Sequence, residues 1–251
     1  MKNLLLVIII AALSLSTGQA QAVDQAASLY RIQTIRAAPG HLQTFIELNK
    51  QLAAQGFYAQ WGSQAPFIGR HSQGDHWDIM LIHPLQSYAQ YYATEKIAQR
   101  QAARLKHEKL LAQLAAVTAF QEDVFAYGPP LSRLTEKFKD NSFLHIEIFH
   151  ALAGKKDELL AQRKLENAYL QGIKRTANEI FVMHAGGDAD IMTIGFYPSL
   201  QAFAAPQTMD DQQRDTVARQ VGFKSLDDIS YYLRALISAH HDTLANVVRY
   251  E

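Results

Sequence analysis

The stretch Leu29-Tyr-Arg-Ile-Gln-Thr-Ile-Arg36 decides the fold, because a related stretch, Phe143-Leu-His-Ile-Glu-Ile-Phe-His150, follows it 114 residues later. Both stretches alternate in polarity and are rich in β-branched residues, which is typical of a β-strand whose two faces meet different surroundings. Each is followed by a glycine, Gly40 or Gly154, at the start of a helical pattern. The two stretches therefore indicate two copies of one strand–helix unit.

Three further matches follow in the same order along the chain, at spacings between 112 and 120 residues. The matched pairs are His71–Asp75 with His184–Asp188, each leading into an Asp-Ile-Met triplet; Pro84–Tyr88 with Pro198–Phe203; and Val117–Glu122 with Ile237–Asp242. Ordered matches at a nearly constant spacing are the signature of an internal repeat. The sequence therefore predicts a duplicated protein.

Each copy has the element order strand, helix, strand, Gly-Asp turn, strand, helix, strand. The predicted strands are 29–36, 66–73, 77–83 and 122–127 in the first copy, and 143–150, 179–185, 189–197 and 242–249 in the second. The predicted helices are 40–55, 87–117 and 155–173, followed by a helical region broken near Pro206 and Gly222. This order is that of a ferredoxin-like unit. We expect one repeat over 23–130, a linker over 131–142 and a second repeat over 143–251.

The first 22 residues have the pattern of a secretory signal. Lys2 precedes an apolar run from Leu4 to Leu13, and Ala20-Gln21-Ala22 ends the segment. The apolar run is much shorter than the roughly 20 residues that span a bilayer, and an Ala-x-Ala sequence is typical of a cleavage site. We expect cleavage between Ala22 and Val23, a periplasmic or secreted protein, and no membrane insertion of the mature chain.

The composition excludes several classes of protein. The 24 basic residues balance 24 acidic residues, so bulk charge does not favour binding to nucleic acid. There is no cysteine, which excludes thiol nucleophiles, thiolate metal sites and disulfides. The apolar fraction of 48% and the charged fraction of 19% argue against disorder. We expect a globular protein without a cofactor.

With this element order, its Pro39-Gly40 and Ala153-Gly154 helix starts, and its Trp77-Asp78-Ile79-Met80 strand, the chain resembles the dimeric α/β-barrel superfamily that contains antibiotic-biosynthesis-monooxygenase-like domains. The resemblance covers essentially the whole mature chain. It implies an α+β fold in which the two tandem ferredoxin-like repeats form an intramolecular dimeric α/β barrel around a ligand-sized lumen. Members of the superfamily include cofactor-independent oxygenases, haem-handling enzymes, isomerases and binding proteins, so the resemblance selects none of these activities.

Strand alternation predicts which side chains face the lumen. Leu144, Ile146 and Ile148 form a fully apolar face, which we expect under the helices. That choice turns the opposite face of the strand, with His145 and Glu147, into the lumen. The same reasoning applied to the first repeat and to the two hairpins gives the complete lumen set: Arg31, Gln33, His71, His145, Glu147 and His184.

Buried polar side chains need partners, and these six invite two interpretations. In a functional pocket, Arg31 would hold an anionic group, His145 and Glu147 would be catalytic and transfer protons, and Gln33, His71 and His184 would contact the ligand. Alternatively, the six side chains satisfy one another, or the histidines lie at a solvated rim.

Neighbouring aspartates and histidines suggest other chemistry, but their spacing argues against it. Asp78 and Asp190 count onto the strand faces opposite their histidines, so we expect them to hold backbone N–H groups and not to form catalytic dyads. His145 and Glu147 could form a facial metal set with His184, yet nothing in the sequence brings His184 close, and no metal is expected.

The other histidines give weaker signals. His240-His241-Asp242 is expected at a solvated strand entrance, and His107 is expected on the surface of a charged helix instead of acting as a haem ligand. Tyr88, Tyr91 and Tyr92 have helical spacing and are expected to pack in the core.

The sequence leaves three functions open. The first is an exported protein that binds a small organic molecule in a polar lumen. The second is a metal-independent monooxygenase- or isomerase-like enzyme acting on a small carbonyl or phenolic compound. The third is a structural or partner-binding module with a filled lumen. The sequence does not settle whether further chains associate.

Overall fold

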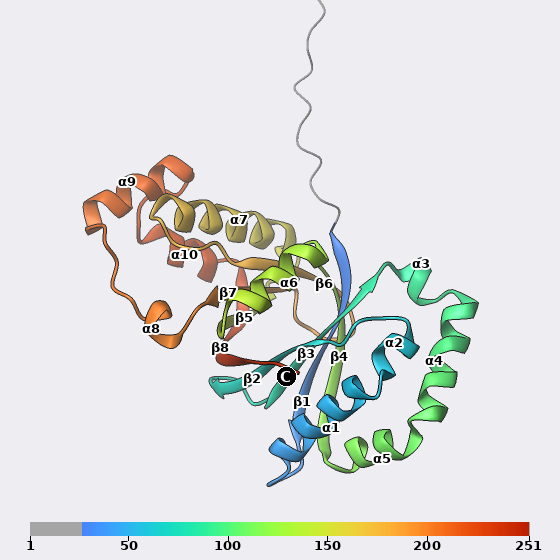
Figure 1. Ribbon diagram of the computed structural model, residues 1–251. Helices are drawn as coiled ribbons and strands as arrows, with labels where there is room; N and C mark the ends of the chain where they lie inside the picture. Colours follow the sequence, from blue (N-terminus) through green and yellow to red (C-terminus); the bar gives the residue numbers. More distant parts are fainter. Residues whose placement is uncertain (1–26, 251) are drawn as a thin grey trace, which may run out of the picture.

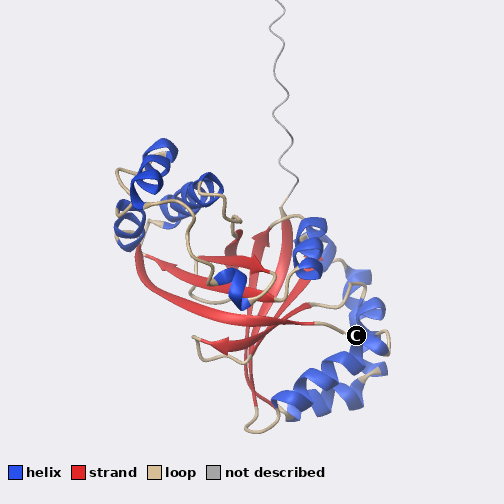
Figure 2. Cartoon of the chain, turned by 60° about the vertical axis from the view of Figure 1, so that its left-hand side comes forward, coloured by secondary structure: helices blue, strands red, loops and turns tan. Residues whose placement is uncertain are grey.

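The computed structural model describes residues 27–250, in which eight strands close into one barrel in the order β1-β3-β2-β8-β5-β7-β6-β4 (Figure 1). The strands are β1 (Ser28–Ala37), β2 (Phe67–Gln73), β3 (Ile79–Gln86), β4 (Thr118–Gly128), β5 (Phe143–Ala151), β6 (Glu179–Ala185), β7 (Ile191–Tyr197) and β8 (Ile237–Val248). Figure 2 shows the strands curving around a common interior, with helices outside them. The expected signal, residues 1–22, lies outside the described residues.

Each half of the chain contributes four neighbouring antiparallel strands to the barrel. Two seams join the halves: β2 pairs with β8, and β4 pairs with β6. The predicted α+β fold is confirmed, with two ferredoxin-like repeats forming an intramolecular dimeric barrel. All eight predicted strands are present, and the largest boundary difference is at β8, which begins at Ile237, five residues earlier than expected.

Helices cover the outer faces of both halves (Figure 1). They are α1 (Leu42–Ala54), α2 (Phe57–Trp61), α3 (Tyr88–Tyr91), α4 (Thr94–Lys106), α5 (Glu108–Ala116), α6 (Leu131–Asp140), α7 (Lys156–Gly172), α8 (Leu200–Phe203), α9 (Asp211–Val221) and α10 (Asp228–Arg234). The predicted single helix over 87–117 is instead three helices, α3 to α5. The predicted breaks at Pro206 and Gly222 are confirmed, since Pro206 lies between α8 and α9, and Gly222, with φ +117°, ends α9.

The segment expected to be a simple linker contains α6. Leu134 and Phe138 on this helix are buried in the same apolar cluster as Phe196, against which the partly buried Phe67 packs, and the Phe67 and Phe138 rings stack at 4.6 Å between centroids. The connection between the halves therefore also contributes to the core. None of the helices in the described range 27–250 has the length and apolarity that a membrane crossing needs.

The barrel interior is apolar. Strands of both halves bury Tyr30, Ile32, Met80, Leu144 and Ile146 in one cluster with side chains of β6, β7 and β8. The prediction of a polar lumen is therefore wrong, because the fully apolar face of β5, and the Tyr30 and Ile32 face of β1, turn inward and not towards the helices. The interior is where the two sheets pack against each other, so it takes the strand faces that leave fewer polar groups to satisfy.

This inversion moves most of the predicted lumen set. Arg31 and Gln33 on β1, and His145 and Glu147 on β5, alternate with interior residues and so project outside the barrel wall, beneath the helices. His184 is also outside. Of the six, His71 alone faces inward, where its ring lies 5.6 Å from the buried Trp77 ring.

The two hairpins are held in the same way in both halves. Asp78 Oδ2 accepts a hydrogen bond from the Ala37 N–H at 2.9 Å, and Asp190 Oδ2 accepts one from the Ala151 N–H at 2.9 Å. Both aspartates thus hold a backbone N–H at the end of the neighbouring strand, as predicted. The matching contacts also show that the duplication extends to individual hydrogen bonds.

Candidate functional site

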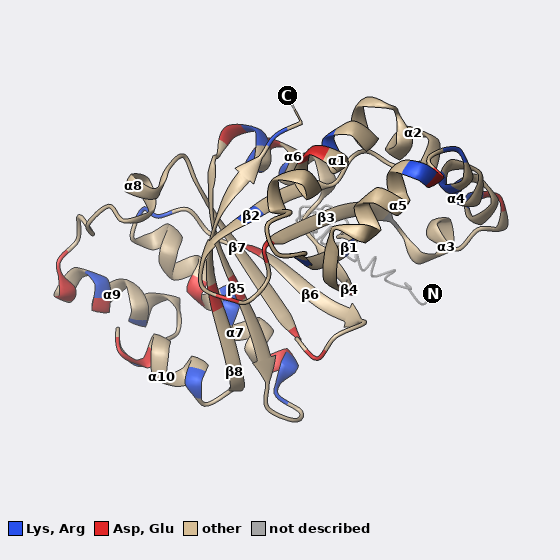
Figure 3. Ribbon diagram, turned by 90° about the horizontal axis from the view of Figure 1, so that it is seen from below, with Lys and Arg blue, Asp and Glu red and all other residues tan. Residues whose placement is uncertain are grey.

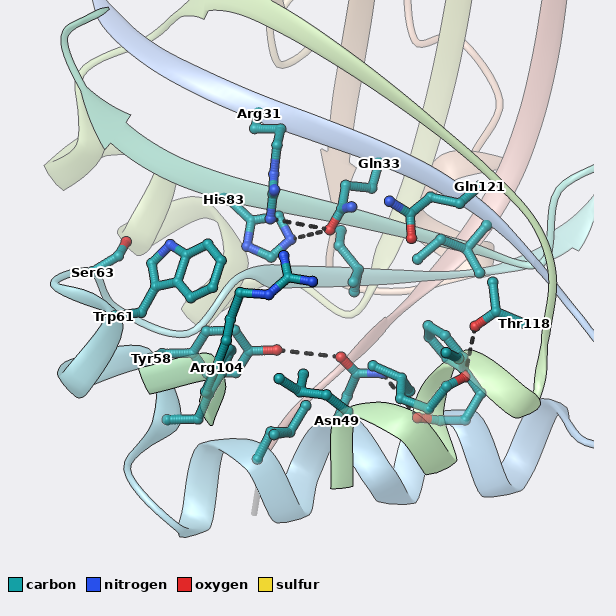
Figure 4. Close-up of a pocket in the computed structure, with 18 of the residues that line it drawn as sticks. Arg31, Gln33, Asn49, Tyr58, Trp61, Ser63, His83, Arg104, Thr118 and Gln121 are labelled. Carbon is teal, nitrogen blue, oxygen red and sulfur yellow. Dashed lines mark hydrogen bonds between the residues drawn. The ribbon is translucent and has the colours of Figure 1, made fainter. Parts of the chain in front are cut away.

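A cavity of about 390 Å³ lies between the outer face of the N-terminal sheet and helices α1, α2, α4 and α5. Its sheet wall carries Arg31 and Gln33 from β1 and His83 from β3, while Tyr58 from α2 and Arg104 from α4 approach from the helical side (Figure 4). Further polar or aromatic lining residues are Asn49, Phe57, Trp61, Ser63, Thr118 and Gln121.

The helical wall depends on a short helix between two glycines. Gly56 precedes α2 with φ +72°, and Gly62 ends it with φ +87°. Both values lie in the left-handed region, which glycine adopts without a steric penalty. The sharp start and stop present Tyr58 and Trp61 to the cavity from a helix of only five residues.

His83 belongs to a hydrogen-bonded chain that fixes its protonation. The Gln33 amide nitrogen donates to Asp123 Oδ1 at 2.8 Å, so the amide oxygen of Gln33 faces the His83 Nε2, at 2.6 Å. Because an amide oxygen only accepts, His83 must carry its proton on Nε2. The chain therefore leaves the Nδ1 of a neutral His83 with a free lone pair.

The electrostatics of the cavity keep His83 in this neutral form. Burial lowers the pKa of the imidazole well below its usual value of 6.5, and the nearby Arg31 charge lowers it further. Desolvation and a like charge both disfavour the imidazolium. At neutral pH, His83 is therefore uncharged, and its Nδ1 carries no proton.

Tyr58 is held as a hydrogen-bond donor. Asn49 uses its amide nitrogen on the Phe45 carbonyl at 2.9 Å, so its oxygen accepts from the Tyr58 hydroxyl at 3.2 Å. Burial raises the pKa of the Tyr58 phenol, although the Arg31 charge opposes this shift. Tyr58 is therefore protonated at neutral pH and cannot be the base of the site.

Two guanidinium groups give the cavity a positive character. Arg31 Nε is buried without a hydrogen-bond partner, and the nearest carboxylate oxygen, Asp123 Oδ1, is 3.7 Å away. Arg104 extends from α4 towards His83 and Gln33 (Figure 4). The cavity thus offers a base, two cations and an aromatic wall, which suits a small aromatic compound that forms an anion.

The fold has known counterparts among solved structures. The chain is similar to an anthrone oxidase-like protein, at 13% identity and a TM-score of 0.59, over 89% of this chain and 92% of the other. It is also similar to a Fusobacterium nucleatum protein described as a putative monooxygenase, at 8% identity and a TM-score of 0.51, over 89% and 94% of the two chains. No protein-family model matches the sequence, and no curated protein matches it.

The chain has a dimeric α/β-barrel fold, which it shares with these two structures. At these identities the likeness concerns the fold alone. Within a dimeric α/β barrel made of two linked repeats, every site on one half has a corresponding site on the other, and the two can be compared.

The second site of this dimeric α/β barrel contains the two residues predicted to be catalytic. His145 and Glu147 occupy the positions of Arg31 and Gln33, and Asp242 occupies that of Asp123, since Gln33 pairs with Asp123 and Glu147 with Asp242 across the sheet. His145 Nε2 lies 3.2 Å from Asp242 Oδ1. The Thr193 hydroxyl donates to Glu147 Oε2 at 2.9 Å.

A buried ion pair lies above these residues. Arg163 on α7, 2% exposed, contacts Glu166 and lies 3.8 Å from Glu147 Oε2. The pKa of His145 is raised, because a hydrogen bond to Asp242 and the charges of Glu147 and Asp242 together outweigh a larger single effect of burial, which lowers it. The roles predicted for His145 and Glu147 stay predictions.

This cluster could also hold a cation. His145, Glu147 and Asp242 each offer a ligand atom, and these atoms lie within 4.8 Å of one another. However, Glu147 is already engaged by Thr193 and by the nearby Arg163 guanidinium. A metal ion would compete with that fixed positive charge, so we assign none.

The hairpin histidines are not equivalent in the folded chain. The His71 N–H donates to the Asp78 carbonyl at 2.9 Å, and the Met183 N–H donates to the Asp190 carbonyl at 2.9 Å. Met183 therefore takes the place of His71, and the pairing of His71 with His184 is wrong by one residue. His184 is exposed, and its Nδ1 lies 3.0 Å from the Tyr88 hydroxyl.

Two other sequence predictions are corrected by the fold, and a third, the solvated position of Asp242, is confirmed. His107 is buried, 6% exposed, with its ring 5.5 Å from that of Phe57. Tyr92 is 55% exposed and stacks on Tyr88, so these tyrosines form a surface cluster. Asp242 is half exposed at the start of β8, as expected for a solvated strand entrance. Its carboxylate also contacts His145 and lies 2.8 Å from His240 Nε2.

Sequence reasoning missed His83. It lies outside the repeated motifs, and its counterpart in the second half is Gly195, because Arg31 pairs with His83 and His145 with Gly195. The available signal was strand alternation, which places His83 on the same face as Leu81, towards the helices.

Proposed function

We propose that the chain is an enzyme that binds a small phenolic or carbonyl compound in the N-terminal cavity and removes a proton from it with His83. The observation that carries this proposal is the neutral, oriented imidazole of His83 beside Arg31 and Arg104. A base next to fixed cations is suited to form and stabilise an organic anion.

The cavity suits an aromatic ring. Phe57, Tyr58 and Trp61 supply ring surfaces on the α2 side, and 390 Å³ lies within the usual volume of small-molecule sites. With the ring against these side chains, the ligand oxygen would be placed towards Arg31 and Arg104, and its acidic C–H or O–H towards His83 Nδ1.

The reaction class we propose is oxygenation by O₂. The anion formed by proton loss is electron-rich. A CH₂ group beside an aromatic system can react with one O₂ to give a C=O group and one water molecule, so the substrate supplies all four electrons. The structural similarity to an anthrone oxidase-like protein and to a protein described as a monooxygenase supports this class without establishing it.

Oxygen uptake with anthrone tests the proposal. We expect the wild-type protein to consume O₂ with anthrone, and we expect His83→Gln to reduce the rate about 100-fold, which is a typical contribution of a general base. His76→Gln is the matched control, because this side chain is 73% exposed and lies outside the cavity. Anthrone that binds without any O₂ uptake would reduce the function to binding, and uptake unaffected by His83→Gln would overturn the role of His83.

We also propose that the protein is exported and that residues 1–22 are removed. The support is the pattern of charge, apolar run and Ala20-Gln21-Ala22. N-terminal sequencing of the protein isolated from the periplasm or medium should begin at Val23. A chain that retains Met1 in the cytoplasm would overturn this proposal.

A further inference from the structure

A second cavity, of about 520 Å³, adjoins the first. The two cavities share three lining residues, Trp61, Ser63 and Leu85. Because Trp61 lines both, its side chain lies at the boundary between the cavity that contains His83 and the second cavity. The two spaces therefore form an inner and an outer chamber with a common wall.

The outer chamber has its own basic side chains. Lys96 and Arg100 on α4 line it, and Figure 3 marks basic residues along this helix. The Arg100 guanidinium lies 4.1 Å from the centre of the Tyr91 ring and 5.9 Å from that of Trp61. Lys96 Nζ donates to Gln99 Oε1 at 3.2 Å. Aromatic stacking holds Arg100 in position and leaves its N–H groups available.

Little negative charge compensates the basic side chains of the two chambers: among residues 27–250, Asp123, whose Oδ1 lies 3.7 Å from Arg31 Nε, is the one carboxylate within ion-pair distance of them. Among the described residues that line either chamber there are four basic side chains, Arg31, Arg104, Lys96 and Arg100, and no Asp or Glu. Within residues 27–250, neither Arg100 nor Arg104 forms an ion pair. A cavity lined by positive charges and no negative ones attracts an anion.

The arrangement along α4 sets the geometry of such an anion. Arg104 reaches the inner chamber and Arg100 the outer one, and four residues of helix separate them by about 6 Å. A ligand that contacts both chambers would place its ring and ionised oxygen in the inner chamber. A second anionic group, one helical turn away, would then lie in the outer chamber near Arg100.

We propose that the outer chamber binds a carboxylate side chain of the substrate through Lys96 and Arg100, so that the preferred substrates are aromatic carboxylates whose ring occupies the inner chamber. This inference rests on the proposed function, because it takes the inner chamber as the site of the ring. It adds the substrate class: an aromatic compound with an acidic tail is preferred to the uncharged analogue.

Two matched probes test the inference by calorimetry. 1-Naphthaleneacetate and 1-naphthaleneacetamide have the same ring and nearly the same shape, and differ in charge. We expect the wild-type protein to bind the acetate at least 10-fold more tightly than the amide. The Lys96→Gln, Arg100→Gln double variant should bind both probes with equal affinity, while its affinity for the amide stays unchanged.

Two further variants separate charge from structure. Arg100→Lys keeps the positive charge without the stacked guanidinium and should retain most of the preference for the acetate. Lys106→Gln removes an exposed charge from the same helix outside both chambers and should change neither affinity.

The outcomes distinguish a failure of the outer-chamber inference from a failure of the proposed function. If the wild-type protein binds both probes and Arg31→Gln weakens both, but the double variant leaves the preference intact, the outer-chamber inference is wrong while the proposed function stands. If the wild-type protein binds neither probe and also fails to oxidise anthrone, both are overturned.

Discussion

His83 Nε2 lies 2.6 Å from Gln33 Oε1, and the same Gln33 donates to Asp123, so one amide orients both the imidazole and the carboxylate. We predict that Gln33→Leu reduces turnover about 10-fold while ligand affinity changes little, because the His83 ring loses the partner that fixes its tautomer. Steady-state kinetics with anthrone measure this as a fall in kcat at nearly constant KM. Gln43→Leu, on the exposed face of α1, is the control, and an equal effect there would contradict the prediction.

The lowered pKa of His83 predicts a pH dependence of stability. The folded state holds this imidazole neutral, so its contribution to the free energy of unfolding is complete above the unfolded pKa of about 6.5 and is lost as the pH falls towards the lower folded pKa. Urea unfolding between pH 7.5 and pH 5 should therefore show a smaller acid-induced loss of stability in His83→Gln than in the wild-type protein. Parallel losses in the two proteins would contradict this sign.

His145 should behave in the opposite way. Its pKa is raised in the folded state, so it stabilises the fold most below about pH 6.5, and this contribution disappears as the pH rises through the folded pKa. His145→Gln should accordingly remove part of the stability loss between pH 6.5 and pH 8. Two-dimensional NMR of the imidazole in Asp242→Asn should show a lower pKa for His145 than in the wild-type protein, because its hydrogen-bonded anion is gone.

Asp78 and Asp190 are predicted to act on stability and not on catalysis. Removing either carboxylate leaves one N–H at a strand end, that of Ala37 or Ala151, without its acceptor. We expect Asp78→Ala and Asp190→Ala each to lower the free energy of unfolding by about 1–3 kcal/mol. O₂ uptake by the remaining folded protein should stay close to that of wild type, and a selective loss of turnover in either variant would reveal a chemical role.

The glycines of the two hairpins should be intolerant of substitution. At Gly74 a Cβ would lie 2.1 Å from the Asp242 carbonyl oxygen, and at Gly186 it would lie 2.2 Å from the Asp123 carbonyl oxygen. Both glycines also have positive φ, 122° and 107°. Gly74→Ala and Gly186→Ala should each cost more than about 2 kcal/mol in urea unfolding.

Gly154→Ala is the matched control for this prediction. Gly154 has φ +75°, but a Cβ there would meet nothing within 4 Å. Gly154→Ala should therefore lower the free energy of unfolding by only about 1 kcal/mol, because alanine is less stable than glycine in a left-handed conformation. Equal losses of stability in all three variants would show that the clash of the added Cβ with the carbonyl of the neighbouring strand has no effect.

The duplication could be predicted because it shows in short sequence patterns. Alternation in Leu29–Arg36 and Phe143–His150, and the glycine after each, depend only on neighbours in the sequence. The direction in which each strand face points could not be predicted in the same way. Both faces of these strands are covered, one by the opposite sheet and one by helices. The alternation of the sequence does not indicate whether the more apolar face packs against the sheet or against the helices.

The error at His184 has the same origin, because Phe181 and Met183, expected under the helices, lie in the interior; the match of His184 with His71 fails for a different reason. The repeats were aligned on the histidine and glycine of the turn, yet the first hairpin is one residue longer between His71 and Asp78 than the second is between His184 and Asp190. Alignment on Asp-Ile-Met would have matched His71 with Met183. A one-residue shift changes the face of every residue in a strand, so it is the expected position of His71, derived from its match with His184, that depends on this alignment.

The cavity itself was beyond prediction. Arg31 and Gln33 were identified as ligand-contacting candidates from their place on the strand, and both do line a cavity. Tyr58, His83 and Arg104 come from three other elements, and only the folded chain brings them to the same space.

The linkage of both halves in one polypeptide gives each of them independence. In an assembly of two identical subunits, any substitution appears twice, and both sites change together. Here Arg31 and His145 occupy corresponding positions yet differ, as do His83 and Gly195. One half can thus keep a cavity beside His83, while the corresponding positions of the other half carry a different set of polar side chains that includes His145, Glu147 and Arg163.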